Sequence, residues 1–260
     1  MTRIFSRIAF TLVSVSMVAL LSGCVPSDGS DGLEVAVSVP AAHDTAYDGR
    51  LVLLLSSDTT DASEPRFQLR SERNRSAQAF GIDVEGWQAG EAAVFDASVF
   101  GFPLPSLAGV PAGTYRVQAV LNRYEAFELS TGHTVMLPPD MGEGQQWNRK
   151  PGNLYSEPTL VTIDPTARKR VDLVLDREIP PIDPPTDSKY IRHVRMRSEM
   201  LSEFWGRDMY LGAHVLVPEG FDEHPEAEYP LMVFHGHFPS DFGGFRTEPP
   251  DPDMECVYSE

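Results

Sequence analysis

The stretch Val110-Pro-Ala-Gly-Thr-Tyr-Arg-Val-Gln-Ala-Val-Leu121 decides the fold of the first part of this chain. Its proline fixes φ and its glycine permits a positive φ, so Pro-Ala-Gly predicts a turn. After the turn, apolar side chains recur at every second position, at Tyr115, Val117, Ala119 and Leu121. In a strand this period places all four on one face. The stretch therefore predicts a turn followed by a β-strand with one apolar face.

Similar short runs lie on both sides of this stretch. Residues 33–39 alternate apolar with polar or small residues, and residues 51–55 are fully apolar, as in a buried strand. Further β-type runs occupy residues 67–69, 79–84, 160–163 and 170–175. Short strands separated by turn residues, without a long helical period, predict a mainly-β fold with a β-sandwich over residues 33–176. The Pro-Ala-Gly-Thr-Tyr turn and strand resemble those of immunoglobulin-like and carboxypeptidase-regulatory-like modules, which implies an immunoglobulin-like sandwich but no particular function.

Proline and acidic residues mark the end of this domain. Residues 176–188 read Asp-Arg-Glu-Ile-Pro-Pro-Ile-Asp-Pro-Pro-Thr-Asp-Ser. Such a composition is typical of a stiff, extended linker. We therefore place a linker at residues 177–188 and a second region at residues 189–260.

The second region opens with three strand-like runs. Residues 190–198 alternate like an edge strand, residues 209–218 predict a second strand, and residues 229–234, Tyr-Pro-Leu-Met-Val-Phe, predict an apolar third strand. The order strand, turn, strand, Val-Pro-Glu-Gly-Phe, loop, Tyr-Pro-Leu-Met-Val-Phe-His-Gly resembles the start of an esterase-type α/β-hydrolase. The resemblance implies an antiparallel pair that precedes the first central parallel strand. It also implies that residues 189–260 hold the opening strands of an incomplete α/β-hydrolase sheet.

By the same resemblance, His235 and Gly236 begin the oxyanion loop, and the backbone N–H of His237 is a candidate oxyanion donor. The Gly-x-Ser-x-Gly nucleophile elbow of that family is absent from the sequence, so no catalytic nucleophile is assigned. No ester hydrolysis by that mechanism is expected from this chain by itself, and an ester becomes a substrate only if the hydrolase domain is completed. A hydrolase sheet needs a domain on the order of 200 residues. The sequence thus suggests a truncated product or a small degenerate addition.

His235 and His237 also allow a second interpretation. Two histidines two positions apart on a strand point to one face, which is the spacing of a metal-ligand pair, as in metal-dependent amidohydrolases. No histidine follows His237 to complete such a site, so neither a metal nor another cofactor is predicted. His193 and His214 lie on strand-like runs and are interpreted as structural.

The first 24 residues predict export. Arg3 and Arg7 precede an uncharged apolar stretch, residues 8–21, which is shorter than the ~20 residues of a membrane span. The stretch ends in Leu21-Ser22-Gly23-Cys24, which resembles the bacterial lipoprotein lipobox. That resemblance implies a signal peptide at residues 1–23, a lipid such as palmitate on Cys24, and a tether at residues 24–32. An ordinary signal peptide or an uncleaved anchor is the alternative.

Lipidation makes a membrane of the bacterial cell envelope the predicted partner. Val25 follows the cysteine, which by resemblance to Gram-negative lipoproteins favours the outer membrane or cell surface. The formal net charge of -17 argues against a nucleic-acid partner. With Cys24 lipidated, Cys256 is the one remaining cysteine, and it is either a buried thiol or the partner of a cysteine in a continuation of the chain.

The long loop at residues 137–155 leaves two interpretations open. Its aromatic residue, Trp147, and the polar residues beside it suit a loop that binds a sugar or a peptide. An elaborate connection whose Trp147 packs onto the sandwich explains the same residues. The alternative function for the whole chain is accordingly a non-enzymatic surface lipoprotein whose sandwich binds a glycan, a peptide or an envelope partner.

Overall fold

The computed structural model of the protein describes residues 32–43, 45–72 and 76–236, together with the single positions 242, 244, 245 and 247. The described chain is mainly β, which confirms the predicted fold class. Its first twelve strands are β1 (Leu33–Ser38), β2 (Ala46–Ser56), β3 (Gln78–Gln88), β4 (Ala92–Phe95), β5 (Gly101–Phe102), β6 (Gly113–Arg123), β7 (Glu125–Glu128), β8 (Thr134–Leu137), β9 (Leu154–Tyr155), β10 (Thr159–Ile163), β11 (Lys169–Val174) and β12 (Arg177–Glu178).

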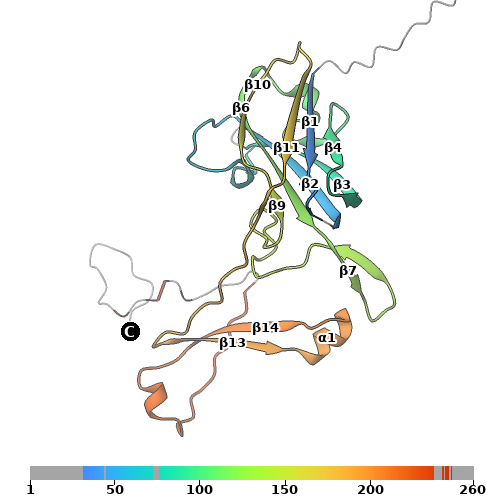
Figure 1. The fold of residues 1–260 in the computed structure, drawn as a ribbon. Helices are drawn as coiled ribbons and strands as arrows, with labels where there is room; N and C mark the ends of the chain where they lie inside the picture. The colour runs from blue at the N-terminus through green and yellow to red at the C-terminus, as the bar shows by residue number, and fades with distance from the viewer. Residues whose placement is uncertain are drawn as a thin grey trace, which may run out of the picture.

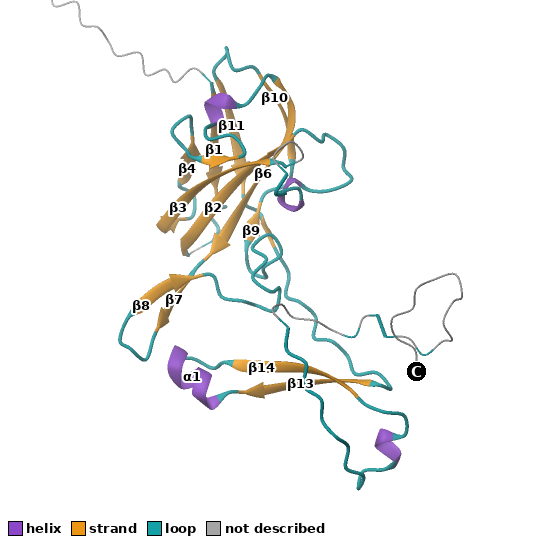
Figure 2. Ribbon diagram, turned by 180° about the vertical axis from the view of Figure 1, so that it is seen from behind, coloured by secondary structure: helices purple, strands orange, loops and turns teal. Residues whose placement is uncertain are grey.

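Two of the sheets share one apolar core (Figures 1 and 2). The smaller sheet has the order β11-β1-β4, with β11 parallel and β4 antiparallel to β1. The larger sheet has the order β12-β9-β6-β2-β3-β5, and β10 also pairs with β6. We call these two sheets and their loops the two-sheet domain. Its last strand, β12, lies inside the residues that the sequence suggested as linker.

Strand β6 has the alternating apolar face that its sequence predicts. The four residues Tyr115, Val117, Ala119 and Leu121 all belong to the shared core, as predicted. Three of them lie directly opposite core leucines of β2, in the pairs Val117–Leu55, Ala119–Leu53 and Leu121–Leu51. Directly opposed side chains on one face are the unit of stabilisation in an antiparallel sheet. The β2–β6 pair is therefore the centre of the core.

The other face of β6 is buried too, which its sequence did not predict. Arg116, Gln118 and Val120 are all buried, although the first two are polar. The cover is a 3-10 turn, η1 (Pro65–Phe67), together with the long loop between β8 and β9. The sequence predicts a strand at residues 67–69, and that prediction is wrong. This segment packs over the outer face of β6 and pairs with none of the described strands.

The second region contains a hairpin of β13 (Ile191–Arg197) and β14 (Tyr210–Leu216), joined by helix α1 (Glu199–Trp205). The antiparallel pair was predicted from residues 190–198 and 209–218, and the structure has it in full register. The helix was not predicted. Ser198 caps its first turn by accepting from the N–H of Leu201, and Gly206 ends it at φ 66.

Helix α1 contacts the hairpin of β7 and β8, which continues from β6 below the two-sheet domain (Figure 1). The rings of Phe127 and Trp205 meet edge to face at 5.5 Å. The N–H of Ser130 donates to the carbonyl of Phe204 at 3.0 Å. Arg207 lies over the ring of Phe127 and pairs with Glu125 at 2.8 Å. We call this contact the β7–β8 clasp.

The third predicted strand, residues 229–234, is absent. The structure places this segment outside any helix or strand, and it pairs with none of the described strands. Its prediction rested on apolar composition, and a strand that is apolar on both sides forms only where neighbours cover both faces. No described element takes that position, so the strand prediction is wrong for this structure.

Truncation of the core should separate a buried leucine from an exposed one. Leu53→Ala removes a side chain of 0% exposure opposite Ala119, and we expect a loss of about 2–5 kcal/mol in the free energy of unfolding. Leu160→Ala, on the neighbouring β10 but 60% exposed, is the matched control and should change it by less than about 0.5 kcal/mol. Urea unfolding followed by circular dichroism measures both, and equal losses would contradict the assigned core.

Candidate functional site

The site residues predicted from the sequence fall partly outside the described residues. Cys24, His237 and Cys256 all lie there. His235 is exposed and Gly236 is half-buried, at the end of the irregular segment that follows η4 (Phe221–Glu223). The structure therefore describes the first two residues of the predicted oxyanion loop and does not describe its predicted donor.

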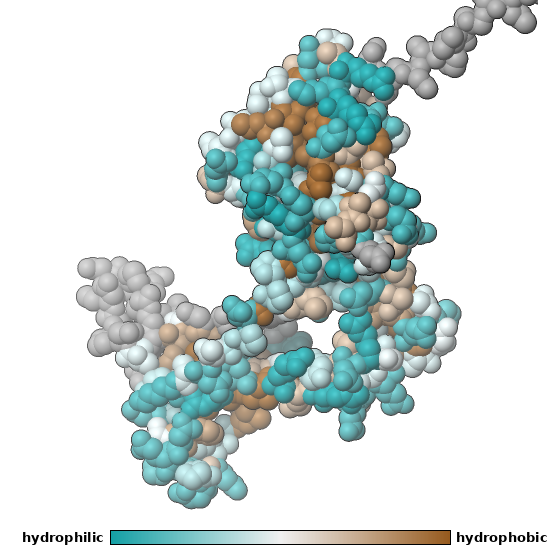
Figure 3. All heavy atoms as spheres, in the orientation of Figure 1, coloured by the Kyte–Doolittle hydropathy of each residue, from teal (hydrophilic) through white to brown (hydrophobic). Residues whose placement is uncertain are grey.

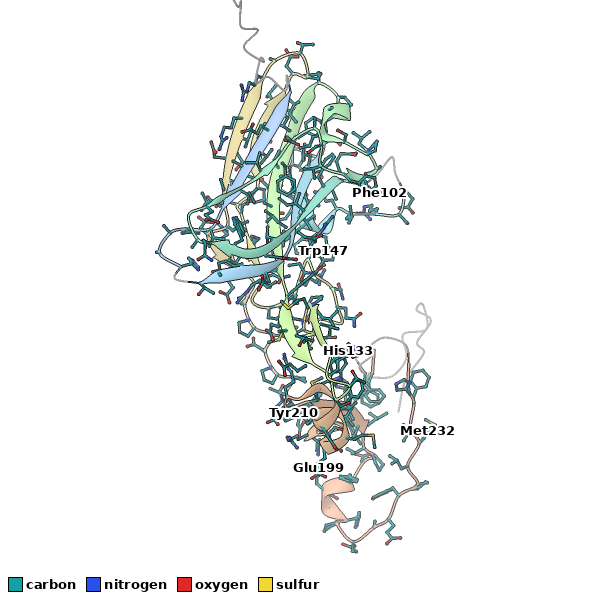
Figure 4. All side chains as sticks on the ribbon, turned by 90° about the vertical axis from the view of Figure 1, so that its right-hand side faces the viewer. Phe102, His133, Trp147, Glu199, Tyr210 and Met232 are labelled. Carbon is teal, nitrogen blue, oxygen red and sulfur yellow. The ribbon has the colours of Figure 1, made fainter. Side chains whose placement is uncertain are left out.

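The residues before His235 form an exposed apolar run. Leu231, Met232, Val233 and Phe234 are 81%, 89%, 78% and 82% exposed. Figure 4 labels Met232 on this outlying part of the chain, and Figure 3 shows apolar surface on the second region. Singly exposed apolar residues are ordinary on a protein surface, whereas four large ones in succession are unusual. We call residues 231–234 the uncovered run.

Three polar side chains meet on the β13–β14 hairpin. His193 and His214 are directly opposite each other in the register, with ring centroids 4.8 Å apart and planes at 90°. Asp187 precedes β13, and its Oδ1 accepts from the backbone N–H of His193 at 2.8 Å. The same oxygen lies 3.2 Å from Nδ1 of His193. The bond from the backbone N–H lowers the pKa of Asp187 below its ordinary value.

From the sequence, both histidines are interpreted as structural residues. Their proximity follows from the strand register, which pairs His193 with His214. Nδ1 of His214 is buried and makes no hydrogen bond within the described part of the chain. Among the described residues, no group of three or more His, Cys, Asp or Glu side chains is arranged to hold a metal ion. The hairpin thus offers a pair of imidazoles with a carboxylate behind one of them.

A buried polar network lies under the loops that cover β6. The guanidinium of Arg66 lies between the rings of Phe67 and Tyr155, at 4.5 and 4.3 Å. It donates to Glu64 at 2.8 Å and to the carbonyl of Asn148 at 3.1 Å. The side-chain amide of Gln118 donates to the same Glu64 at 2.7 Å. These bonds tie η1 and the long loop to the outer face of the sheet.

The long loop itself is anchored at further points. Asn153 is fully buried, and its amide nitrogen donates to the carbonyl of Trp147 at 2.7 Å. Lys150 is buried, donates to the carbonyl of Arg123 at 2.8 Å, and has its pKa lowered, chiefly by burial. Trp147 is half-buried (Figure 4). Several polar side chains of this loop are therefore hydrogen-bonded within the fold, which supports its interpretation as an elaborate connection.

A small depression of about 80 Å³ lies at the end of the two-sheet domain where β1 begins, between Leu33, Leu107, Val110 and Ile163. It is too small for a drug-sized ligand, which needs roughly 300 Å³ or more. Within the part of the chain that the structure describes, no helix is long and apolar enough to cross a membrane.

Comparison with known proteins gives no relative. The chain matches no family model, no curated protein and no solved structure.

Protonation of Glu64 should weaken the folded state. Burial, the largest single effect, raises its pKa, but the bonds from Gln118 and Arg66 and the nearby Arg66 and Arg177 charges together lower it. A folded-state pKa below the unfolded value gives stability that is present above the unfolded pKa, about 4.3, and lost as pH falls through the folded pKa. We expect Glu64→Gln to show a smaller loss of unfolding free energy than the parent between about pH 5 and 3.

Chemical unfolding at several pH values measures this dependence. Glu85→Gln is the matched control, because Glu85 is exposed on β3 and lies outside the Arg66 network. Identical pH profiles for Glu64→Gln and the parent would show that the network does not hold the carboxylate in its charged form.

Proposed function

We propose that this chain is an exported, lipid-anchored protein of the bacterial cell envelope. In this proposal the two-sheet domain is an immunoglobulin-like β-sandwich, and the second region holds the opening strands of an esterase-type α/β-hydrolase domain. The outer membrane or cell surface is the favoured location. Membrane attachment is through lipid on Cys24.

The uncovered run carries the hydrolase part of the proposal. Residues 231–234 are 78–89% exposed and lead directly into His235 and Gly236. Exposing four large apolar side chains costs roughly 1.5–3 kcal/mol for each one relative to full burial. A run that is apolar on both sides suits a central parallel strand, which is covered on both faces. The run forms no strand here, but in a completed domain it would follow the antiparallel β13–β14 pair as the resemblance implies.

The arrangement of the domains supports a role for the first one as a spacer. Strand β1 begins at the end of the two-sheet domain that lies far from β13 and β14 (Figures 1 and 2). A lipid on Cys24 would hold that far end near the membrane, because only residues 24–32 lie between the lipid and β1. The second region would then project away from the membrane surface.

This chain supplies only part of the chemistry of an esterase. By resemblance, His235 and Gly236 would shape the oxyanion loop, where backbone N–H groups stabilise a developing negative charge. The Gly-x-Ser-x-Gly elbow is absent from the sequence, so the nucleophile and its acid and base would have to come from elsewhere. We assign the chain itself no hydrolytic activity, and ester substrates belong to a completed domain.

Lipidation is tested by metabolic labelling in a bacterial host. The chain should incorporate labelled palmitate and sediment with the membrane fraction, and Cys24→Ala should abolish both, since no other thiol stands at a lipobox. Cys256→Ala is the matched control and should keep the label. Label that persists in Cys24→Ala would contradict the anchor.

The hydrolase part is tested separately, by reading the nucleotide sequence that follows the codon for Glu260. A Gly-x-Ser-x-Gly elbow in any frame, followed by an acid and a histidine, is the expected result. Its absence, with lipidation intact, would overturn the hydrolase assignment and leave a lipid-anchored protein of a different function.

A further inference from the structure

The β13–β14 hairpin places two imidazoles at a separation that one metal ion can bridge. His193 and His214 are paired in the antiparallel register, so their side chains stand on the same face. A metal binds an imidazole nitrogen at about 2.0–2.1 Å, which puts the ring centre about 3.2 Å from the ion. Two ligand rings at about 90–110° around one ion then have centres about 4.5–5.3 Å apart. The observed separation of 4.8 Å falls within this range.

Asp187 prepares His193 for this role. Its Oδ1 is fixed by the backbone N–H of His193 and lies 3.2 Å from the ring Nδ1. A carboxylate at that nitrogen keeps the proton on Nδ1 and leaves the Nε2 lone pair for a ligand bond. This is the carboxylate–histidine arrangement that orients metal ligands and raises their basicity. Asp187 belongs to the segment before β13, so this contact also joins that segment to the hairpin.

His214 supplies the second observation. Its Nδ1 is buried and makes no hydrogen bond within the described residues. A buried ring nitrogen without a partner is costly, and native structures rarely keep one without a reason. Coordination of an ion by this nitrogen would supply the missing partner. The two rings now meet edge to face, so one of them must rotate about χ2, which is a broad torsion in histidine.

Two arginines, Arg195 and Arg197, share this face of β13 with His193. Arg197 pairs with Asp208 at 2.7 Å, and Arg195 lies over the ring of Tyr210 at 3.5 Å. Gly212, opposite Arg195, adds no side chain beside His214. Asp187 is the carboxylate that contacts His193, with its Oδ1 3.2 Å from the ring Nδ1. The face therefore presents two imidazoles with one carboxylate behind them.

We propose that His193 and His214 form a two-histidine site for a late first-row divalent cation, Zn²⁺, Ni²⁺ or Cu²⁺. Imidazole ligands favour these ions over Mg²⁺ or Ca²⁺. Because no third side chain of the usual ligand types is arranged there among the described residues, water or a small ligand would complete the coordination. The site is independent of the proposed hydrolase function and uses none of its residues.

Binding would clamp the two strands together. An isolated two-stranded hairpin is marginal in water, and both edges of β13–β14 lack a further strand among the described residues. An ion that binds the folded hairpin in preference to the open one stabilises it by mass action. The site would thereby couple metal supply in the envelope to the order of the second region.

Isothermal titration of the untagged full chain with Zn²⁺ tests the proposal. We expect one site per chain, a loss of at least tenfold in affinity for His193→Gln and for His214→Gln, and a loss of about tenfold for Asp187→Asn, which keeps both ligands. His224→Gln and His235→Gln are the matched controls, because both histidines are exposed and neither has a hydrogen bond, ion pair or ring contact with His193 or His214. Hydrogen exchange of residues 191–216 should slow with Zn²⁺ in the parent and in both control variants, but not in His193→Gln or His214→Gln.

Two results would overturn the site. Zinc binding that survives both His193→Gln and His214→Gln, or that is lost in His235→Gln instead, places the ion elsewhere. Absence of zinc binding in the parent would refute the site outright. Circular dichroism of each variant shows whether the domain is still folded, and Asp187→Asn keeps the test decisive if a histidine variant loses its hairpin.

Discussion

The pairing of β2 with β6 is the interaction on which the rest of this structure depends. Leu51, Leu53 and Leu55 meet the alternate residues of β6 across the ladder, and all are essentially inaccessible to water. The smaller sheet closes one face of this pair with apolar side chains. The loops around η1 close the other face with a hydrogen-bonded polar network, in which Arg66, Glu64 and Gln118 satisfy one another. Polar groups tolerate burial on that face because each has a partner.

The same strand positions the second region. After Arg123 the chain passes from β6 into the β7–β8 hairpin, which holds α1 through the Phe127–Trp205 contact and the Arg207–Glu125 ion pair. An exposed ion pair by itself contributes little, roughly 0–1 kcal/mol. The aromatic contact and the bond from Ser130 to the Phe204 carbonyl give the clasp its specificity. The second region is thus held at one end, while the uncovered run remains exposed.

The sequence predicts most of the features that depend on the local alternation of apolar and polar residues. The alternation in β6 and the two strands of the β13–β14 hairpin are where their patterns placed them. It did not predict the burial of Arg116 and Gln118, because that burial depends on loops distant in sequence. The pairing of His193 with His214 depends on register, which alternation alone does not fix. Residues 229–234 show the opposite error, since composition predicted a strand for which no described neighbour exists.

The described segments therefore differ in whether neighbouring elements cover them. The core segments are packed around β2 and β6, whereas the run before His235 pairs with no strand in the part of the chain that the structure describes. Native-state hydrogen exchange, followed by mass spectrometry on the dilute full chain at neutral pH, measures this difference directly. We predict slow exchange, near the global unfolding limit, for amides of residues 113–121, and exchange close to the rate of an unstructured peptide for residues 231–236. Strong protection of residues 231–236 would contradict the account, because it would mean that this run is already covered.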